Sequence, residues 1–523
     1  MKKHFATPLL LITLLAVYDF LFWNEAMGIN FPVFILLLIT VLVYSFPHFN
    51  KSRIAIATLL LAAIGAVLIT ITNTMLSKIT GVVMMGITVA FVHQVSLRSV
   101  PYAVGYVTVN FIQTPQKILR AVGGMMKHSP NLNKMFRYHK LVYFPAGITV
   151  VFLIIYSIGD PQFASLLDSF ITGFFDWLHW LAQYFTATHF LFLVLGSLLI
   201  TTAIIPTEAT ALVEAELKQR DDLRRERKKF IKPQPDATFN YGTTFSRSRT
   251  LMTALKNEYR KGVLTLVMIN LLLLCVNAID IVKVWFEGQS IFPAGADWKS
   301  VSSMRSSAVH EGTDALILSI LLAMAVLLFF FRGNINFLRR NQFLRELAYI
   351  WIFQNALLVI TVAIRNYYYI SDCGLTMKRI GVYAFLLATL FGLFTFFIKI
   401  LEKKSSFYLI RINCWAVCII FVLLSCVDWD PYMAQYNITH IPEEKLDKQF
   451  LLWLSDHALP ILVQHKEIFI NDNVSPGKSQ RNEAMIERRI DHFLSYYESH
   501  SWQSWNYADY KVYTFLKTQN LIQ

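Results

Sequence analysis

Long apolar runs recur along almost the whole chain, and they limit the possible folds more than any other feature. A transmembrane helix needs about 20 residues, because it rises about 1.5 Å per residue and the hydrocarbon core is about 30 Å thick. The pattern therefore predicts an all-α fold, a polytopic transmembrane helical bundle with about eleven spans. These runs lie at residues 7–23, 30–46, 54–72, 79–97, 141–158, 189–206, 262–282, 312–331, 347–364, 380–400 and 407–427, so that the transmembrane domain occupies residues 1–427.

The composition agrees with a membrane protein. Hydrophobic residues make up 55% of the 523 residues and charged residues only 16%, whereas soluble domains carry about 25% charge. The first apolar run follows Lys2 and Lys3 and ends in Phe20-Leu21-Phe22-Trp23 without a small-residue cleavage site. We therefore expect an uncleaved signal anchor.

The distribution of basic residues predicts the orientation. If the N-terminus lies inside, the inner segments hold 31 Lys and Arg and the short outer loops hold seven, as the positive-inside rule expects. Thirteen of the 31 fall in residues 207–261, a basic cytoplasmic loop whose first half is expected to extend the sixth span as a solvated helix. The net charge of +14 is explained in this way, and no nucleic-acid partner is expected.

An odd number of spans places residues 428–523 outside. This tail carries nine basic and thirteen acidic residues, and apolar residues such as Ile486, Ile490 and Phe493 recur at helical spacing. We expect a small domain of three or four short helices, with the tail as a surface for an envelope protein partner.

Two further segments are expected to lie along the membrane surface. Residues 163–186 carry Asp168 and Asp176, which are costly in a bilayer, so we expect a helix lying flat on the outer face. On the inner face, Thr114 and Pro115 predict the start of a helix. Its basic residues suit an anionic lipid, and a helix packed beneath the bundle is the equal alternative; these residues are Lys117, Arg120 and Lys127.

Polar residues gather at the predicted outer ends of the eighth, ninth and tenth spans. Basic residues are unusual on that side, so nearby acids are expected to compensate them. A structural ion-pair network is one interpretation, and a groove for an anionic lipid or glycan is the other. The candidate cluster consists of His310, Glu311, Asp314, Arg365, Asn366, Lys378 and Arg379.

Known catalytic motifs are absent from the sequence. We find no phosphate-binding loop, dinucleotide fingerprint, zinc-protease motif or nucleophile elbow, and the five cysteines form neither a disulfide framework nor a zinc site. No catalytic residue, metal site or cofactor is therefore expected, and a non-enzymatic role is favoured.

Several short motifs between residues 260 and 523 resemble a bacterial family of multi-pass membrane proteins that is known only as a domain of unknown function. They include Val309-His310-Glu311-Gly312, Ile364-Arg365-Asn366-Tyr367-Tyr368, Lys378-Arg379-Ile380-Gly381, Asp428-Trp429-Asp430, Leu454-Ser455-Asp456-His457 and Trp502-Gln503-Ser504-Trp505-Asn506. The resemblance implies an inner-membrane protein of a Gram-negative, Bacteroidetes-like bacterium, and it implies no activity. In such a bacterium the outer tail that the topology predicts lies in the periplasm. Together with the topology, it suggests an envelope scaffold or sensor. The alternative is a membrane enzyme or transporter that handles lipid-linked or anionic envelope substrates at the polar cluster.

Overall fold

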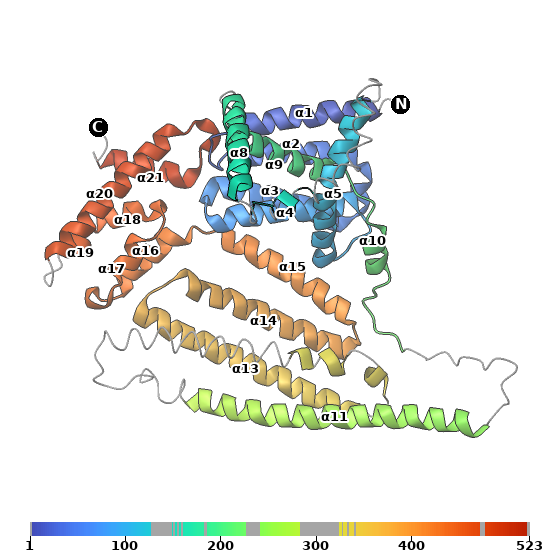
Figure 1. The fold of residues 1–523 in the computed structure, drawn as a ribbon. Coiled ribbons are helices and arrows are strands. Elements are labelled where there is room, and N and C mark those ends of the chain that lie inside the picture. The colour runs from blue at the N-terminus through green and yellow to red at the C-terminus, as the bar shows by residue number, and fades with distance from the viewer. Residues whose placement is uncertain are drawn as a thin grey trace. The chain divides into compact units, whose positions relative to one another are not determined.

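The computed structural model describes most of the chain (Figure 1). The described residues are 3–126, 149, 152–153, 156–157, 161–182, 186–225, 241–282, 324–326, 328–331, 334–338, 341–470 and 476–519. Every regular element among them is a helix, which confirms the all-α prediction for this part of the chain. The chain divides into two compact units: residues 1–97, 102–214 and 497–508 form unit 1, and residues 98–101, 215–496 and 509–523 form unit 2.

Unit 1 is built mainly from the N-terminal helices, to which a short C-terminal segment is added. Its elements are α1 (Lys3–Phe22), α2 (Asn30–Ser45), η1 (Pro47–Lys51), α3 (Arg53–Thr72), α4 (Met75–His93), most of α5 (Val100–Met126), α8 (Pro161–Ala182), α9 (Ala187–Ile204), part of α10 (Thr210–Leu217) and η6 (Trp502–Ser504).

The α3–α4 hairpin shows how local sequence sets the helix ends. Ser52 and Thr74 accept hydrogen bonds from Ala55 N and Ser77 N, so each caps the first turn of a helix. A Cβ atom added to Gly65 would lie 3.2 Å from the Cα atom of Gly81, so these two glycines let the helices approach closely.

Two predictions about where helices begin or end are wrong, one at the end of α9 and one within α5. The α9 helix ends at Ile204, and α10 is a separate helix, so the sixth span does not extend into the basic loop. The physical reason is Pro206, which disfavours helical geometry at Ile205 and has no N–H for the helix ladder. Thr114 does not begin a helix either: it lies inside α5, where its hydroxyl donates to Asn110 O at 2.8 Å.

The α8 helix covers most of the segment predicted to lie on the outer surface. Asp168 and Asp176 are both exposed, and so are the large apolar side chains Leu166, Phe170 and Phe175. The helix is therefore confirmed, whereas its position along a membrane surface stays a prediction.

Unit 2 contains the long apolar helices of the second half of the chain together with most of the tail. Its elements are α11 (Tyr241–Ile281), η3 (Asn334–Phe337), α13 (Gln342–Cys373), α14 (Met377–Glu402), α15 (Ser406–Ser425), α16 (Trp429–His440), η4 (Glu443–Lys445), α17 (Lys448–Leu452), η5 (Asp456–Ala458), α18 (Leu459–Gln464), α19 (Lys466–Ile470), most of α20 (Pro476–Ser499) and most of α21 (Tyr507–Thr518).

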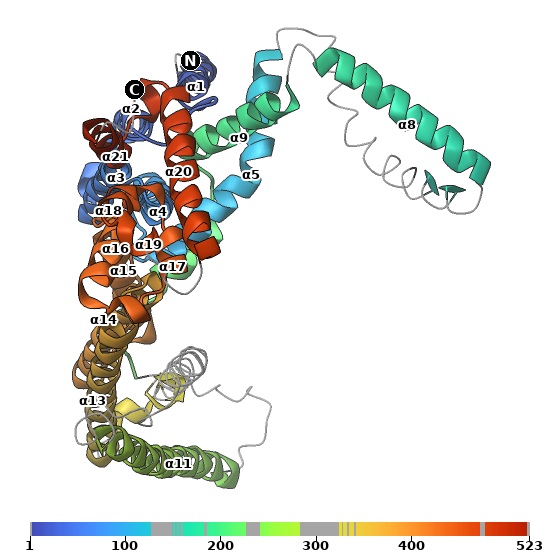
Figure 2. The same cartoon turned by 90° about the vertical axis from the view of Figure 1, so that its left-hand side faces the viewer.

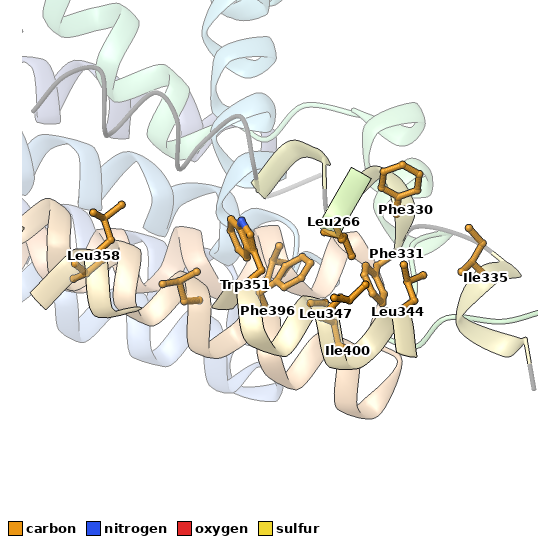
Figure 3. Close-up of a cluster of buried hydrophobic side chains, with 14 of the residues drawn as sticks. Leu266, Phe330, Phe331, Ile335, Leu344, Leu347, Trp351, Leu358, Phe396 and Ile400 are labelled. Carbon is orange, nitrogen blue, oxygen red and sulfur yellow. The ribbon is translucent and has the colours of Figure 1, made fainter. Parts of the chain in front are cut away.

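The α11 and α13 helices pack side by side and run in the same direction. Asn270 Nδ2 donates to Leu347 O at 3.0 Å, and Asn277 Nδ2, seven residues later, donates to Gln354 O at 3.1 Å. Equal spacing in the same sense on both helices fixes their parallel alignment. Around these bonds lies an apolar core in which Trp351, Phe396 and Phe331 are almost completely buried (Figure 3).

The part of the tail in unit 2 begins with the short helices α16, α17, α18 and α19, which Figure 2 shows gathered in one group. It continues with most of the 24-residue helix α20 and of α21, so the tail has more helices than the three or four short ones predicted. Ile486, Ile490 and Phe493 on α20 are buried, so the apolar spacing noted in the sequence does form a core face.

Seven described helices are long and apolar enough to cross a membrane, which indicates a membrane-embedded protein. They are α3, α4, α9, residues 256–279 of α11, α13, α14 and α15, and α1 and α2 contain shorter apolar helices. Nine of the eleven predicted spans thus coincide with described apolar helices. The other two predicted spans, 141–158 and 312–331, lie largely outside the described residues.

Candidate functional site

The α13–α14 turn brings together two members of the predicted polar cluster. Asn366 Nδ2 on α13 donates to the backbone carbonyl of Arg379 on α14 at 3.1 Å. Arg365 adjoins Asn366, and Lys378 is exposed on the first turn of α14. The remaining members, His310, Glu311 and Asp314, lie outside the described residues. The cluster as a whole therefore stays a prediction.

Arg379 directs its guanidinium toward the end of α13. Its Nη1 donates to Cys373 O at 2.9 Å and also to Gly374 O. A cation at the C-terminus of a helix is favourable, because the last carbonyls lack helical partners and carry the negative end of the helix dipole. Arg379 thus stabilises the turn, which is a structural task.

The same turn holds the first helix of the tail. Asn437 on α16 is buried; its Oδ1 accepts from Leu375 N, and its Nδ2 donates to Leu375 O at 2.9 Å. Gly374 has φ +81°, and a Cβ atom there would lie 2.6 Å from Asn437 Oδ1, so both the backbone conformation and the close approach require glycine. The tail is in this way hydrogen-bonded to the turn between two membrane-type helices.

A groove opens beside this turn, between α13, α14, α15 and α16. Its volume is about 570 Å³. Aliphatic side chains such as Leu387 and Leu424 form its floor, and Tyr367, Tyr432 and Tyr436 contribute phenol rings. The groove is thus mainly apolar, with hydroxyl groups supplied from α13 and α16 and from Tyr383 on α14, whose hydroxyl donates to Ala363 O.

Three segments of the tail meet at His457. Its Nδ1 lies 2.8 Å from Asp428 Oδ2 and its Nε2 lies 3.1 Å from Asp509 Oδ1, while the His457 side chain is only 11% exposed. Burial by itself lowers the pKa of His457, but the two carboxylates outweigh burial and raise this pKa to about 9. His457 is therefore a cation at neutral pH and joins η5 to the start of α16 and to the first turn of α21.

A neighbouring ion pair strengthens the same region. Arg489 Nη2 on α20 lies 2.7 Å from Asp456 Oδ1, and the same guanidinium donates to Leu452 O and Leu454 O. The tail is held together by charged groups that satisfy one another and nearby backbone carbonyls.

Within unit 1, the segment 502–505 docks on the loop between α1 and α2. Ile29 N donates to Trp505 O at 2.8 Å, and Ala26 N donates to Ser504 Oγ at 2.8 Å. Glu25 accepts from Ser501 N and from Ser504 Oγ. Burial raises the pKa of Glu25, but these hydrogen bonds outweigh it and leave the pKa below the usual value.

A polar network surrounds the end of α9 in unit 1. The carbonyls near Pro206 accept from side chains of α4 and α5: Ala203 O lies 2.9 Å from His93 Nε2, Thr202 O accepts from Asn110 Nδ2, and Ile205 O accepts from Lys117 Nζ at 2.9 Å. Lys117 thus points its ammonium group into the protein. Of the other bases predicted to meet anionic lipid, Arg120 is exposed and Lys127 lies outside the described residues.

The sequence analysis missed the site at His457. Asp428 and His457 both occur in motifs that carried the family resemblance, but no local spacing links residues 428, 457 and 509. Only tertiary packing brings them together. Among the described residues, no three His, Cys, Asp or Glu side chains form a candidate metal site.

Comparison with known proteins identifies the family but no activity. A family model described as "Domain of unknown function (DUF4153)" matches residues 10–465. The match adds most of the N-terminal half to the resemblance noted for residues 260–523, but it ends before residues 466–523, which include the motif at 502–506. No curated protein and no solved structure matches the chain. Because the family model covers well over half of the sequence, the chain belongs to the DUF4153 family.

Proposed function

We propose that this protein is an integral membrane scaffold or sensor of the bacterial cell envelope that presents its tail at the outer face of the inner membrane. The observation that carries the proposal is the attachment of the tail to turns between apolar helices. Asn437 bonds to the α13–α14 turn, and Ser504 and Trp505 bond to the α1–α2 loop. Within each unit, a segment of the tail is thus hydrogen-bonded to a loop between apolar helices, which suits a docking role.

Helix directions within each unit support eleven spans. Because α11 and α13 are parallel, the chain must cross back between them if both helices span the membrane, and the sequence predicts a span for that crossing at 312–331. The C-terminal ends of α4 and α9 meet at the His93–Ala203 hydrogen bond, so if both helices span the membrane they end on the same face and one crossing must lie between them, for which the notable apolar run is the predicted span at 141–158.

With eleven spans and the N-terminus inside, the turns that hold the tail fall on the outer side. The basic loop 207–261 then lies in the cytoplasm and residues 428–523 lie in the periplasm, in agreement with the positive-inside rule.

The proposed partner is another envelope protein that binds the tail. Trp453, at the end of α17, is 78% exposed, and large exposed aromatic side chains are enriched at protein interfaces. We expect a photo-crosslinking amino acid at position 453 to give a discrete protein adduct in intact cells that express the chain natively. The same amino acid at Glu444, which is exposed on the polar element η4, is the matched control and should give none.

The chemical identity of the adducts shows whether Trp453 lies at a protein interface or faces the membrane. A protein adduct from position 453 that is an envelope protein, identified by mass spectrometry, supports the proposal. Lipid adducts alone, or equal adducts from positions 453 and 444, contradict it.

The alternative is a membrane enzyme or transporter for lipid-linked or anionic substrates at the polar cluster. The contacts of Arg379 favour the scaffold over this alternative, because its guanidinium is used to cap α13. An anion site would need the guanidinium directed into an open groove.

A further inference from the structure

The groove between α13, α14, α15 and α16 differs from the rest of the apolar helix surface because it is concave and has a partly polar rim. Its volume of about 570 Å³ falls within the range of small-molecule sites, about 300–1,000 Å³. Leu387 on α14 and Leu423 on α15 line it and are both more than half exposed, so no described part of the protein covers the floor.

The position of the groove indicates what covers it. Its floor belongs to α13, α14 and α15, which are apolar enough to span a membrane, so the groove opens toward bilayer hydrocarbon. The aromatic residues come from the last turns of α13, from Tyr383 near the start of α14 and from α16, where tyrosine and tryptophan are typical of the bilayer interface. An occupant therefore has a hydrocarbon chain along the floor and a polar end near α16.

Hydroxyl groups at the rim are free to bind that polar end. Tyr367, Tyr432 and Tyr436 all line this one groove, and burial together with the neighbouring groups of Tyr367 and Tyr432 raises the pKa of Tyr436. None of the three hydroxyls hydrogen-bonds another residue in the described part of the chain. Trp429, in contrast, is already fixed, because its Nε1 donates to Leu424 O at 2.9 Å.

We propose that this groove is a binding site for one membrane lipid, whose hydrocarbon chain lies along Leu387, Leu423 and Leu424 and whose ester or phosphate oxygens accept hydrogen bonds from the phenols of Tyr367, Tyr432 and Tyr436. The lipid would lie between the membrane helices and the first helix of the tail. Its binding requires only that α13, α14 and α15 span a membrane, and it does not depend on a protein partner of the tail.

The test uses the full-length protein in phosphatidylcholine vesicles that contain a phosphatidylcholine with a photoactivatable diazirine on its acyl chain. Labelled peptides should concentrate in residues 367–387 and 420–436. Leu387→Trp fills the groove and should reduce labelling there at least fivefold. The matched control is Leu390→Trp, because Leu390 is exposed on the same helix but does not line the groove, and labelling should be unchanged.

A second pair of variants on α15 guards against a folding defect. Leu423→Trp fills the groove, whereas Ile419→Trp places the same side chain on an exposed position outside it, and melting temperatures within each pair should agree. Double replacement of Tyr432 and Tyr436 by Phe should weaken labelling by removing the hydroxyls alone. Equal labelling in the filled and control variants, or uniform labelling along every exposed helix face, would mean ordinary surrounding lipid and would overturn the proposal.

Discussion

His457 and Arg379 are charged residues that each join separate segments of the chain. His457 joins segments that lie far apart in the sequence, and Arg379 joins the two helices on either side of a turn. His457 lies between two carboxylates, and Arg379 lies at the carbonyl end of α13. In both cases the charge is compensated inside the protein. Removing either side chain would leave polar groups in a partly buried place without partners, which costs more free energy than the bond itself contributes.

The stability of the tail should depend on pH through His457. Its folded pKa of about 9 lies above the ordinary 6.5, so protonation favours the folded state. The contribution, at most about 3 kcal/mol, is complete below about pH 6.5 and is lost as the pH rises through 9. We expect the melting temperature of the detergent-solubilised protein to fall between pH 6.5 and 9.5, with faster proteolysis of the tail.

Replacement of His457 by Asn should remove this pH dependence and lower the melting temperature at pH 7, because Asp428 and Asp509 then lack a cation. His492→Asn is the control, since His492 is exposed on α20. A pH profile that is the same in His457→Asn and in the unaltered protein would show that another group is responsible.

Arg379→Ala should separate the structural role of the polar cluster from a binding role. The carbonyls of Cys373 and Gly374 lose their donor, so we expect a loss of stability of about 1–3 kcal/mol, measured as a lower melting temperature in detergent. Lys378→Ala, on an exposed neighbour, should have little effect. An unchanged melting temperature together with loss of copurified anionic lipid would instead favour the enzyme or transporter alternative.

At the level of helices, the sequence predicted elements well where the determining signals are local. Apolar length placed α3, α4, α14 and α15 within a few residues of their ends. The α13 helix, predicted to stop at residue 364, continues to Cys373, because the aromatic residues 367–369 and the carbonyl cap from Arg379 extend it past the apolar run.

The docking of segment 502–505 on the α1–α2 loop can be tested with glycine substitutions. A Cβ atom at Gly28 would overlap the backbone carbonyls of Ser504 and Trp505, and backbone atoms cannot rotate away. Gly28→Ala should therefore cost about 1–3 kcal/mol and expose the C-terminus to proteases. At Gly173 on α8 a Cβ atom would meet nothing within 4 Å, so Gly173→Ala should leave proteolysis unchanged. Equal protection in both variants would contradict the docked arrangement.

At the level of the whole molecule, the sequence predicted membrane character and could not predict the tertiary contacts. Apolar runs and basic loops are one-dimensional signals, and the resemblance to a family was confirmed by the match to residues 10–465. The candidate site is different, because it depends on pairs such as Asn437 with Leu375 and Asp428 with His457. Residues so far apart meet only after the helices have packed, and no spacing rule relates them.

The topology is the prediction on which the proposed function rests, and reporter fusions can decide it. Truncations fused to green fluorescent protein, which fluoresces in the cytoplasm, should be bright after Ser129 and Phe239. Truncations fused to alkaline phosphatase, which is active outside, should be active after Thr172 and Pro476. The physical reason is the positive-inside rule, since the segments 98–140 and 207–261 hold twenty basic residues between them. The helix directions add an independent requirement, because parallel α11 and α13 need one crossing between them. Cytoplasmic fluorescence after Pro476 would mean an even number of spans and would place the tail, with its His457 cluster, on the inner side.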